Sequence, residues 1–382
     1  MRVRLGEVCI INPSMTSLSD DYEVSFVPMP KVSEDGEIDA STVKQFAEVK
    51  KGFTYFEEND VLFAKITPCM ENGKGAVARN LINGVGFGST EFHVLRPHKE
   101  RIISEWLYYM TSWEVFRKQC EKNMTGSAGQ KRVPKAYLEK YPLELPTLAE
   151  QKHQVMILNK ISSLIALRKK QLQKLDELIK ARFVELFGDI NTNDKGWESQ
   201  PLGELCTIVR GGSPRPIENY LGGDVPWIKI GDATKGDNVY LHSTKEHIIQ
   251  DGVKKSRMVK SGSLIFANCG VSLGFARIIT FDGCIHDGWL AMEDIDVRLD
   301  KVFLLQALNQ MTDHFRKIAP AGTQPNLNTA IMKAYIQIIP PIELQKKYIA
   351  FVEQTDKSKL IIQNGLDKLE LMKKALMQKY FG

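Results

Sequence analysis

One long stretch occurs twice in this chain, and this repetition constrains the fold more than any other sequence feature. Residues 141–188 recur without a gap as residues 335–382, at a constant shift of 194 residues. Identical residues fall in register along both copies, among them Tyr141 and Tyr335, Pro146 and Pro340, Gln151 and Gln345, Ala181 and Ala375, and the final Phe-Gly pairs at 187–188 and 381–382. So many coincidences in register indicate a duplicated unit.

Each copy has the start and stop signals of one long helix. Pro146 and the Pro340-Pro341 pair do not fit inside a helix, whereas Gly188 and Gly382 suit the left-handed residue that ends one. Each helix therefore has roughly 38 residues, or a length of about 57 Å at 1.5 Å per residue.

Apolar residues in both copies recur at spacings of three and four, the pattern of a coiled-coil seam. The predicted helix interface consists of Leu158, Ile161, Ile165, Leu172, Leu175 and Ile179 in the first copy and Ile362, Leu366, Leu369 and Leu376 in the second. The second seam is polar at Thr355, Lys359 and Lys373, and such positions cost stability but fix register. Two unrelated surface helices would explain either copy alone, but not their shared register.

The duplication extends beyond the helices. The sequence LGEVC at residues 5–9 returns as LGELC at 202–206, and DVLFAK at 60–65 returns as SLIFAN at 263–268. The repeat unit is therefore a globular module followed by its helix. The predicted domains are module one (1–147), a central helix and linker (148–190), module two (191–341) and a C-terminal helix (342–382).

Within each module, short runs of β-branched and aromatic residues are broken by Gly and Pro, which indicates irregular β-structure with few helices. The clearest local helix spans residues 104–121, with a counterpart at 302–318, and its aromatic stripe is more typical of a core than of a base-stacking platform. Because the first helix passes through a short link into module two and the second starts where that module ends, we expect the helices to run antiparallel. The predicted fold is α+β: two β-rich modules joined by two long antiparallel coiled-coil helices, with pseudo-two-fold symmetry.

The composition of the chain bears on its cellular location and on how it could bind a polyanion. The six cysteines lack CxxC spacing, and we find no signal peptide or 18-residue apolar run, so we expect a cytoplasmic protein with reduced thiols and no membrane partner. The formal net charge is +5. The two helical segments each carry +3, whereas module one carries −1 and module two carries 0. Modules that grip DNA would therefore need local positive charge and added affinity from partner subunits.

No catalytic signature is visible in the sequence. It lacks GxGxxG, GxxxxGK[ST] and HExxH motifs, and the spacing of His242 and His247 does not suit a zinc pair on a helix. We therefore predict no catalytic residue, metal or cofactor in this chain.

Polar loops carry the chemistry that the sequence does suggest. The loop TGSAGQKRVPK at residues 125–135 aligns with PAGTQPNLNTA at 320–330, so Gln130 meets Gln324, whereas Lys131 and Arg132 meet Pro325 and Asn326. Gln and Asn pair bidentately with adenine, and Arg and Lys with guanine. The predicted DNA-binding residues are Gln130, Lys131, Arg132, Lys65 and Lys74 in module one and Arg210, Arg215, Asn268, Gln324, Asn326 and Asn328 in module two. For each single residue, a solvated surface loop remains the alternative.

Over essentially its whole length the chain resembles the specificity subunit of type I restriction-modification enzymes. The resemblance rests on the LGE openings, GFGSTEFHVLRP (86–97), VPWIKIGD (225–232), the two glutamine loops and the EQK and LQK helix starts at 150–152 and 344–346. It implies a non-catalytic subunit whose two target-recognition domains each read half of a bipartite site in double-stranded DNA. The helices would set the spacer and dock two methyltransferase subunits, through which restriction/translocase subunits join. Those partners would bind S-adenosylmethionine, Mg²⁺ and ATP. This chain would bind none of the three.

Two other classes remain open at this point. One is a coiled-coil scaffold whose modules bind protein, and the other is a DNA methyltransferase or nuclease with unrecognised motifs. Methyl transfer or Mg²⁺-dependent cleavage by the chain alone would favour the enzyme. Two modules that read the same face of B-DNA lie about 34 to 36 Å apart, a separation that an inclined helix of about 57 Å accommodates.

Overall fold

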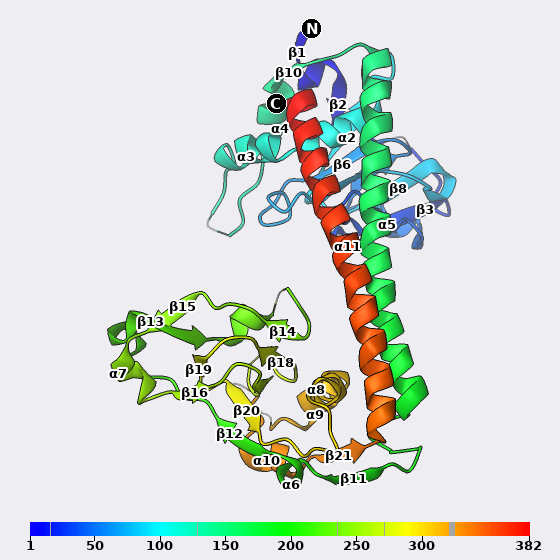
Figure 1. Ribbon diagram of the computed structural model, residues 1–382. Helices are drawn as coiled ribbons and strands as arrows, with labels where there is room; N and C mark the ends of the chain where they lie inside the picture. The colour runs from blue at the N-terminus through cyan, green and yellow to red at the C-terminus, as the bar shows by residue number, and fades with distance from the viewer. Residues whose placement is uncertain (16, 128, 235, 271, 321–324) are drawn as a thin grey trace. The chain divides into compact units, whose positions relative to one another are not determined.

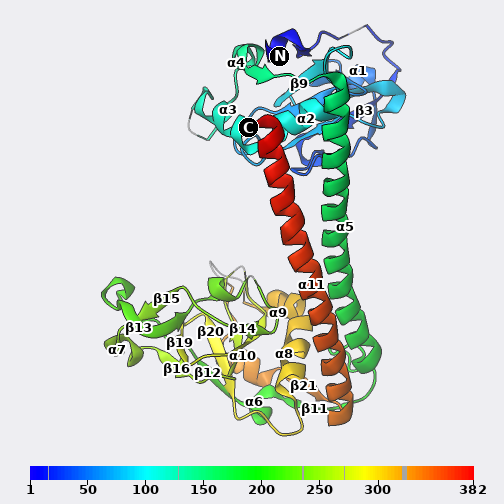
Figure 2. The ribbon, with the colours of Figure 1, turned by 45° about the horizontal axis from the view of Figure 1, so that its top comes forward.

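A computed structural model describes residues 1–15, 17–127, 129–234, 236–270, 272–320 and 325–382. The chain divides into two compact units. Unit one comprises Met1–Lys169 and Asn364–Gly382, and unit two comprises Lys170–Gln363. Each unit holds one β-rich module, the start of one long helix and the end of the other (Figures 1 and 2).

The module of unit one is built on two four-stranded sheets. The first has the order β2-β9-β6-β7 and is antiparallel throughout; the second has the order β4-β3-β8-β5, with β3 and β8 parallel. Their strands are β2 (Cys9–Ile11), β9 (Phe92–Pro97), β6 (Val61–Ala64), β7 (Gly75–Val77), β4 (Val43–Gln45), β3 (Glu23–Val27), β8 (Val85–Gly88) and β5 (Thr54–Glu57). All four residues of β6 are buried, so its apolar run VLFA forms the centre of the module.

Unit two repeats this arrangement. Its sheets have the orders β12-β20-β17-β18-β14 and β15-β13-β19-β16, and β13 and β19 are again parallel. The strands are β12 (Thr207–Arg210), β20 (Trp289–Glu293), β17 (Leu264–Ala267), β18 (Ala276–Ile279), β14 (Tyr240–Leu241), β15 (Glu246–Ile248), β13 (Leu221–Ile228), β19 (Gly283–Ile285) and β16 (Arg257–Val259). Unit two adds β14, which pairs with β18 in parallel, but the order of its other strands and the position of the β13–β19 pair coincide with unit one, so the predicted duplication of the module is confirmed.

A small two-stranded sheet closes each module at the base of a long helix. In unit one β1 (Arg2–Arg4) pairs with β10 (Pro142–Glu144), and in unit two β11 (Glu198–Pro201) pairs with β21 (Ile336–Ile339). Short helical turns complete the modules: η1 (Leu5–Glu7), η2 (Met29–Lys31), α1 (Phe46–Val49), η3 (Ile82–Gly84), α4 (Lys135–Lys140), α6 (Leu202–Leu205), η4 (Ile217–Asn219), η5 (Ile230–Ala233), α7 (Gln250–Val253) and α10 (Thr329–Ala334).

The single helix predicted over residues 104–121 is wrong, because the chain forms two helices there. These are α2 (Ser104–Ser112) and α3 (Glu114–Lys122), separated by an extended Trp113 with φ −65° and ψ 133°. The hydroxyl of Ser112 donates to Tyr109 O at 2.9 Å, and Arg117 Nε donates to Ser112 O at 3.1 Å. Side chains therefore satisfy backbone groups that a continuous helix would pair. The apolar spacing continues across the break, so periodicity could not predict it.

The helix predicted over residues 302–318 is likewise divided, into α8 (Lys301–Gln310) and α9 (Thr312–Ile318) around Met311. Thr312 Oγ1 donates to Asn309 O at 2.8 Å, which is again a side chain bonding to a backbone carbonyl at the break. The aromatic stripe is core, as predicted: Trp106, Trp113 and Phe116 are buried.

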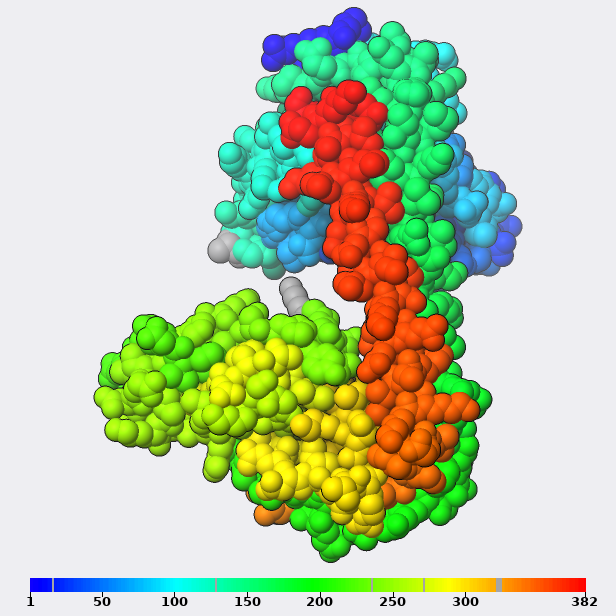
Figure 3. All heavy atoms as spheres, in the orientation of Figure 1, coloured from blue at the N-terminus to red at the C-terminus, as the bar shows by residue number. Residues whose placement is uncertain are grey.

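The two long helices are α5 (Leu148–Phe187) and α11 (Ile342–Phe381), each of 40 residues. Pro146 precedes the first, and Gly188 ends it with φ +77° and an N–H donated to Val184 O at 2.8 Å. Figure 3 shows atoms of α11 at the surface on the face drawn, whereas its side chains Tyr348, Val352, Leu366 and Met377 are buried. Within the described ranges, no helix combines the length and apolar character needed to cross a membrane.

Within each unit the two long helices run antiparallel, as expected. In unit one Met377 shares a buried cluster with Val155 and Leu158. In unit two Tyr348 donates its hydroxyl to Ile179 O at 3.4 Å. The N-terminal part of one helix therefore packs on the C-terminal part of the other in each unit.

The predicted seam residues are buried to different degrees. Leu158, Ile161, Ile165, Ile179 and Leu366 are buried, and Leu172, Leu175, Ile362, Leu369 and Leu376 are half-buried. Two of the three polar seam residues find partners within the helix pair: Thr355 Oγ1 donates to Phe351 O at 2.8 Å, and Lys359 Nζ lies 2.7 Å from Asp176 Oδ1 and 3.3 Å from Asp356 Oδ1. Lys373 Nζ instead lies 5.9 Å from the centroid of the Tyr109 ring of α2.

Candidate nucleic-acid interface

In unit one, several of the predicted DNA-binding residues gather where the central strand β6 ends. The next residue, Lys65, donates its N–H to Glu91 O and accepts a hydrogen bond from Val133 N, both at 2.9 Å. Ile66 then forms an isolated β-bridge with Arg132. These backbone contacts place Arg132 and Val133, in the second half of the polar loop, beside the end of β6. We call this region the polar edge of unit one.

Arg132 is held inside the polar edge by Glu91. Arg132 Nε donates to Glu91 Oε2 at 2.9 Å, and Nη2 donates to Oε1 at 2.8 Å. Such a bidentate pair is stronger and more directional than a single hydrogen bond. The Arg132 hydrogen bond holds the pKa of Glu91 below its usual value. The guanidinium predicted to read a guanine is therefore engaged by a carboxylate in this structure.

Gln130 and Lys131 project from a fixed backbone. Gln130 N donates to Ser127 O at 3.0 Å, and Lys131 O accepts a hydrogen bond from Thr67 N at 3.1 Å. Both side chains are exposed. The loop therefore presents an amide and an ammonium to solvent with their main-chain positions set.

The two remaining predicted lysines of unit one lie in different surroundings. Lys65 is half-buried at the polar edge, and burial lowers the pKa of its ammonium. Lys74 Nζ donates to Met29 O of η2 at 3.5 Å. The backbone of Lys74 lies beside the end of β6, because its O accepts a hydrogen bond from Ala64 N at 3.1 Å, whereas its side chain reaches η2.

A buried histidine supports the edge, a role that no sequence pattern indicated. His93 Nε2 lies 2.7 Å from Val133 O, and Asn12 Nδ2 lies 3.1 Å from His93 Nδ1. Burial lowers the pKa of His93, which favours the neutral ring. Its proton belongs on Nε2, because Val133 O can only accept and Asn12 Nδ2 can only donate. Glu91 and His93 both lie in the GFGSTEFHVLRP motif, so the motif marked the place but did not reveal their partners.

Unit two has an equivalent polar edge at the end of β17. Asn268, the residue after this strand, donates its N–H to Gly288 O at 3.0 Å and accepts from Leu327 N at 2.8 Å. Cys269 forms an isolated bridge with Asn326. The backbone anchoring found at Lys65 in unit one therefore recurs at Asn268.

The asparagines of this edge have different local roles. Asn268 is fully buried, and its Nδ2 donates to Asn326 Oδ1 and to Leu327 O, both at 3.2 Å. Among the residues described, no donor reaches Asn268 Oδ1. Asn328 Oδ1 accepts from Ile331 N at 2.9 Å and caps α10. Gln324 lies outside the described residues.

Both arginines predicted to bind DNA in unit two contact Asp287. Arg210 Nε donates to Asp287 O at 3.1 Å, and Arg215 Nη2 lies 3.3 Å from Asp287 Oδ2. Ser213 Oγ donates to Asp287 Oδ1 at 2.7 Å. Asp287 directly precedes Gly288, so the structure brings Arg210 and Arg215 to the same edge as Asn268. The Arg215 side chain is 81% exposed, which leaves most of its guanidinium open to a ligand.

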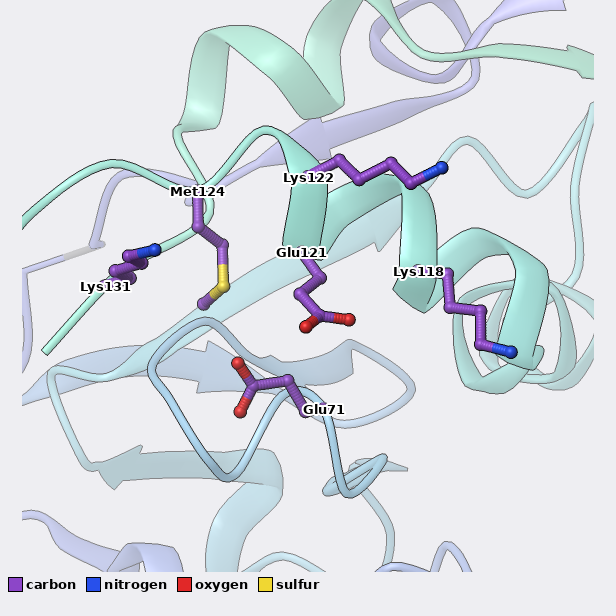
Figure 4. Close-up of a pocket in the computed structure, with 6 residues that line it drawn as sticks. All are labelled: Glu71, Lys118, Glu121, Lys122, Met124 and Lys131. Carbon is purple, nitrogen blue, oxygen red and sulfur yellow. The ribbon is translucent and has the colours of Figure 1, made fainter. Parts of the chain in front are cut away.

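A surface hollow of about 370 Å³ adjoins the polar loop of unit one. It is lined by Lys118, Glu121 and Lys122 of α3 together with Glu71, Met124 and Lys131. Figure 4 shows the carboxylates of Glu71 and Glu121 on opposite sides of the hollow, and the ammonium groups of Lys118 and Lys122 extending from α3. Lys118 pairs with Glu114 at 2.5 Å. Lys122 and Lys131 thus supply positive charge beside the loop predicted to read bases, and sequence reasoning missed the two lysines of α3.

The chemistry offered by the two edges is recognition by hydrogen bonds and charge. Amide, ammonium and guanidinium groups match the donors and acceptors of base edges and phosphates. Across the described residues, no three His, Cys, Asp or Glu side chains form a group that could hold a metal ion. Burial raises the pKa of the Cys9, Cys120 and Cys206 thiols to about 12, which keeps them protonated.

Comparison with known proteins identifies matching sequences and folds. The family model described as "Type I restriction modification DNA specificity domain" matches residues 1–177 and again residues 194–371. The chain is 40% identical over 177 residues to the type I restriction enzyme EcoEI specificity subunit of Escherichia coli, and 41% identical over 175 residues to the EcoAI specificity subunit of the same organism. These matches cover 46% and 45% of this chain but only 30% of each relative.

The fold also matches a solved structure along its whole length. A chain from a study of complex assembly and conformational transition in a type I restriction-modification system superposes with a TM-score of 0.61. The alignment covers 100% of this chain and 97% of the solved one, at 20% sequence identity. At this identity the likeness concerns the fold.

Proposed function

The chain belongs to the type I restriction-modification DNA specificity family, and on that premise we propose how it reads DNA. Each module reads one half of a bipartite site in double-stranded DNA. The long helices set the number of base pairs between the halves and dock two methyltransferase subunits. Restriction/translocase subunits join through the methyltransferases.

One observation carries this proposal: the same module occurs twice with different side chains at the same edge. Lys65 after β6 corresponds to Asn268 after β17, and each is fixed by the same backbone contacts. A lysine suits the acceptors of guanine or a phosphate, whereas an asparagine suits adenine. One scaffold with two sets of polar groups fits two different half-sites in one DNA molecule.

Exposed apolar residues on both long helices support docking of partner subunits. They are Met156, Leu164, Leu167, Leu178 and Val184 on α5 and Leu360, Ile361, Leu371 and Met372 on α11. Met156, Leu167 and Leu178 on α5, and the pairs 360/371 and 361/372 on α11, recur at intervals of eleven, which return to the same face within about 20°. An apolar stripe that stays exposed along a helix is typical of a protein interaction surface.

The charge distribution supports dependence on those partners for affinity. Phosphate contacts supply most non-specific affinity for DNA, yet module one carries a net −1 and module two a net 0. The lysine-rich helices carry +3 each. The methyltransferase subunits therefore supply much of the affinity for DNA. They also bind S-adenosylmethionine, whereas the restriction/translocase subunits use Mg²⁺ and ATP.

Competition binding with the complex of this chain and its methyltransferase partner tests the proposal. The duplexes carry the native site, either half-site scrambled, or both scrambled, at fixed salt. We expect each single scramble to lower specific affinity and the double scramble to bind like random DNA. The isolated chain should bind the native site at least about tenfold more weakly than the complex. Insensitivity to one of the half-sites would contradict the assignment of one half to each module.

A further inference from the structure

A fully buried glutamine in the first turn of α5 joins this helix to the module of unit one. Gln151 Nε2 donates to Arg101 O at 2.9 Å and to Pro146 O at 3.0 Å, and its Oε1 accepts from Ile103 N at 3.0 Å. Ile103 is the N-cap residue of α2. One side chain thus satisfies three backbone groups, on the chain before α5 and on the chain entering α2.

The same device recurs in unit two with the same atoms. Gln345, also fully buried, donates Nε2 to Arg298 O at 2.8 Å and to Pro340 O at 2.7 Å, and its Oε1 accepts from Asp300 N at 2.8 Å. Asp300 is the N-cap residue of α8. Each glutamine side chain therefore lies between the start of a long helix and the start of α2 or α8 in the adjacent module.

From this repeated contact we infer that Gln151 and Gln345 are positioning residues that fix the angle between each module and its long helix. The inference rests on the proposed function, in which the helices set the spacer. A helix measures a distance only if the reading module is held rigidly at its end. The amide suits this task because it offers donors and an acceptor at once. A movement of the module relative to the helix therefore breaks at least one of the three hydrogen bonds.

We call the contact of each glutamine with its module the joint. Because the helix is long, a small change of angle at the joint has a large effect at the far end of the helix. A 40-residue helix spans about 60 Å, so a tilt of about 10° at its first turn moves its other end by about 10 Å. That displacement corresponds to about three base-pair steps of 3.4 Å. Removal of the glutamine amide should therefore relax the choice of spacer while leaving the base recognition of each polar edge intact.

The test uses Gln151→Met and Gln345→Met in the complete complex with the methyltransferase partner. Methionine keeps the length of the side chain but lacks the hydrogen bonds. Gln173→Met is the matched control, because Gln173 lies on the same helix, is exposed and donates only to Glu177 among the hydrogen bonds of the described residues. Gln151→Glu is the harsher variant: it keeps an acceptor for Ile103 N, but it removes both donors and buries a carboxylate oxygen against Arg101 O and Pro146 O. Methylation is measured on duplexes with the native spacer and with one or two base pairs added or removed.

We expect the ratio of methylation at the native spacer to that at altered spacers to fall by about fivefold or more in either Met variant, and to stay unchanged in the control. Native-state hydrogen exchange should show faster exchange at Ile103 or Asp300 in the corresponding variant, which reports the joint independently of DNA. An equal decrease in methylation at every spacer, or an unchanged ratio in a folded Gln151→Glu protein, would reduce the glutamines to ordinary stabilising residues. A wild-type complex that methylates all spacers equally would instead contradict the proposal that the helices set the spacer. Amide hydrogen exchange at Ile103 would still show whether Gln151 fixes the module to the helix.

Discussion

Arg132 and Glu91 form two parallel hydrogen bonds of 2.9 and 2.8 Å, although 41 residues separate them in the chain. The pair closes the polar edge of unit one and holds a guanidinium next to the exposed Gln130. Any interaction of Arg132 with a base must therefore compete with, or share, the Glu91 carboxylate.

The first prediction concerns base reading by this loop. Gln130→Ala and Arg132→Ala should each weaken or relax recognition of one half-site, by about 1 to 3 kcal/mol for each base that the removed side chain reads. The other half-site should be unaffected and serves as the internal control. Competition binding with single-base variants of both half-sites measures the effect. An equal decrease in affinity on every sequence would assign the two side chains to phosphate binding or to structural support.

The second prediction concerns the pH dependence of the Arg132 and Glu91 pair. The pKa of Glu91 lies below its ordinary 4.5, chiefly because of the hydrogen bond from Arg132. A carboxyl with a lowered pKa contributes stability above its ordinary pKa, and this contribution disappears as the pH falls through the folded value. The NMR signal of Arg132 Nε–H should therefore titrate with a midpoint below 4.5 and should not titrate this way in Glu91→Gln. A midpoint at or above 4.5 would contradict the pairing.

The pairing of Arg132 with Glu91 shows a limit of prediction from local sequence signals. The helix ends were predictable because Pro146 and Gly188 act through their own backbone geometry, and the duplication was visible as residue identities in register. The partner of Arg132 was not predictable, since it depends on the pairing of β6 with β9. The cap at Asn328 did carry a local signal, because an asparagine before a short helical run is a typical N-cap, but the loop alignment drew attention to base reading instead.

The third prediction separates support from reading in unit two. Asn268→Ala should destabilise unit two by about 1 to 3 kcal/mol, because it removes two hydrogen bonds from a fully buried amide. Asn326→Ala removes only one of these bonds and leaves Leu327 O as an acceptor, so it should cost less stability than Asn268→Ala while it relaxes the half-site read by module two. Urea unfolding and half-site competition, performed on both variants, distinguish the two roles. The reverse pattern would show that Asn268 reads the base and Asn326 supports it.

The fourth prediction concerns the lysines around the hollow in Figure 4. Lys122→Ala and Lys131→Ala should each reduce the slope of log K against log salt by about 1 if each lysine neutralises one phosphate. Lys118→Ala should have a smaller effect, because Lys118 already pairs with Glu114. Binding measured between low and physiological salt provides the slopes. Unchanged slopes together with a changed base preference would show direct base reading by these lysines.

The fifth prediction concerns the helices as a ruler. Four residues inserted between Leu172 and Leu175 add about 6 Å with a small residual rotation, nearly two base pairs, whereas one inserted residue rotates the rest by about 100° and should mainly disrupt packing. An equal insertion between Ile362 and Leu366 keeps the helix pair matched. The methylated site should lengthen while both half-sites stay the same. An unchanged spacer in an active complex would show that the helices do not measure DNA.

The apolar spacing of the seam was predictable because it repeats locally, yet its polar members were explained only by the fold. Lys359 is tolerated in the interface because Asp176 of the other helix and Asp356 of its own helix both lie within ion-pair distance. The sequence showed the lysine but not its partners. Likewise, the break at Trp113 depends on hydroxyl and guanidinium hydrogen bonds that apolar periodicity does not record.

The most direct test of the central claim is to map methylated adenines in the DNA of cells that contain this chain and its methyltransferase partner. We predict a single asymmetric motif with two short specified halves and a fixed unspecified spacer, in which Arg132→Ala relaxes one half and Asn326→Ala relaxes the other. A contiguous motif, or the same half altered by both substitutions, would contradict the assignment of one half-site to each module.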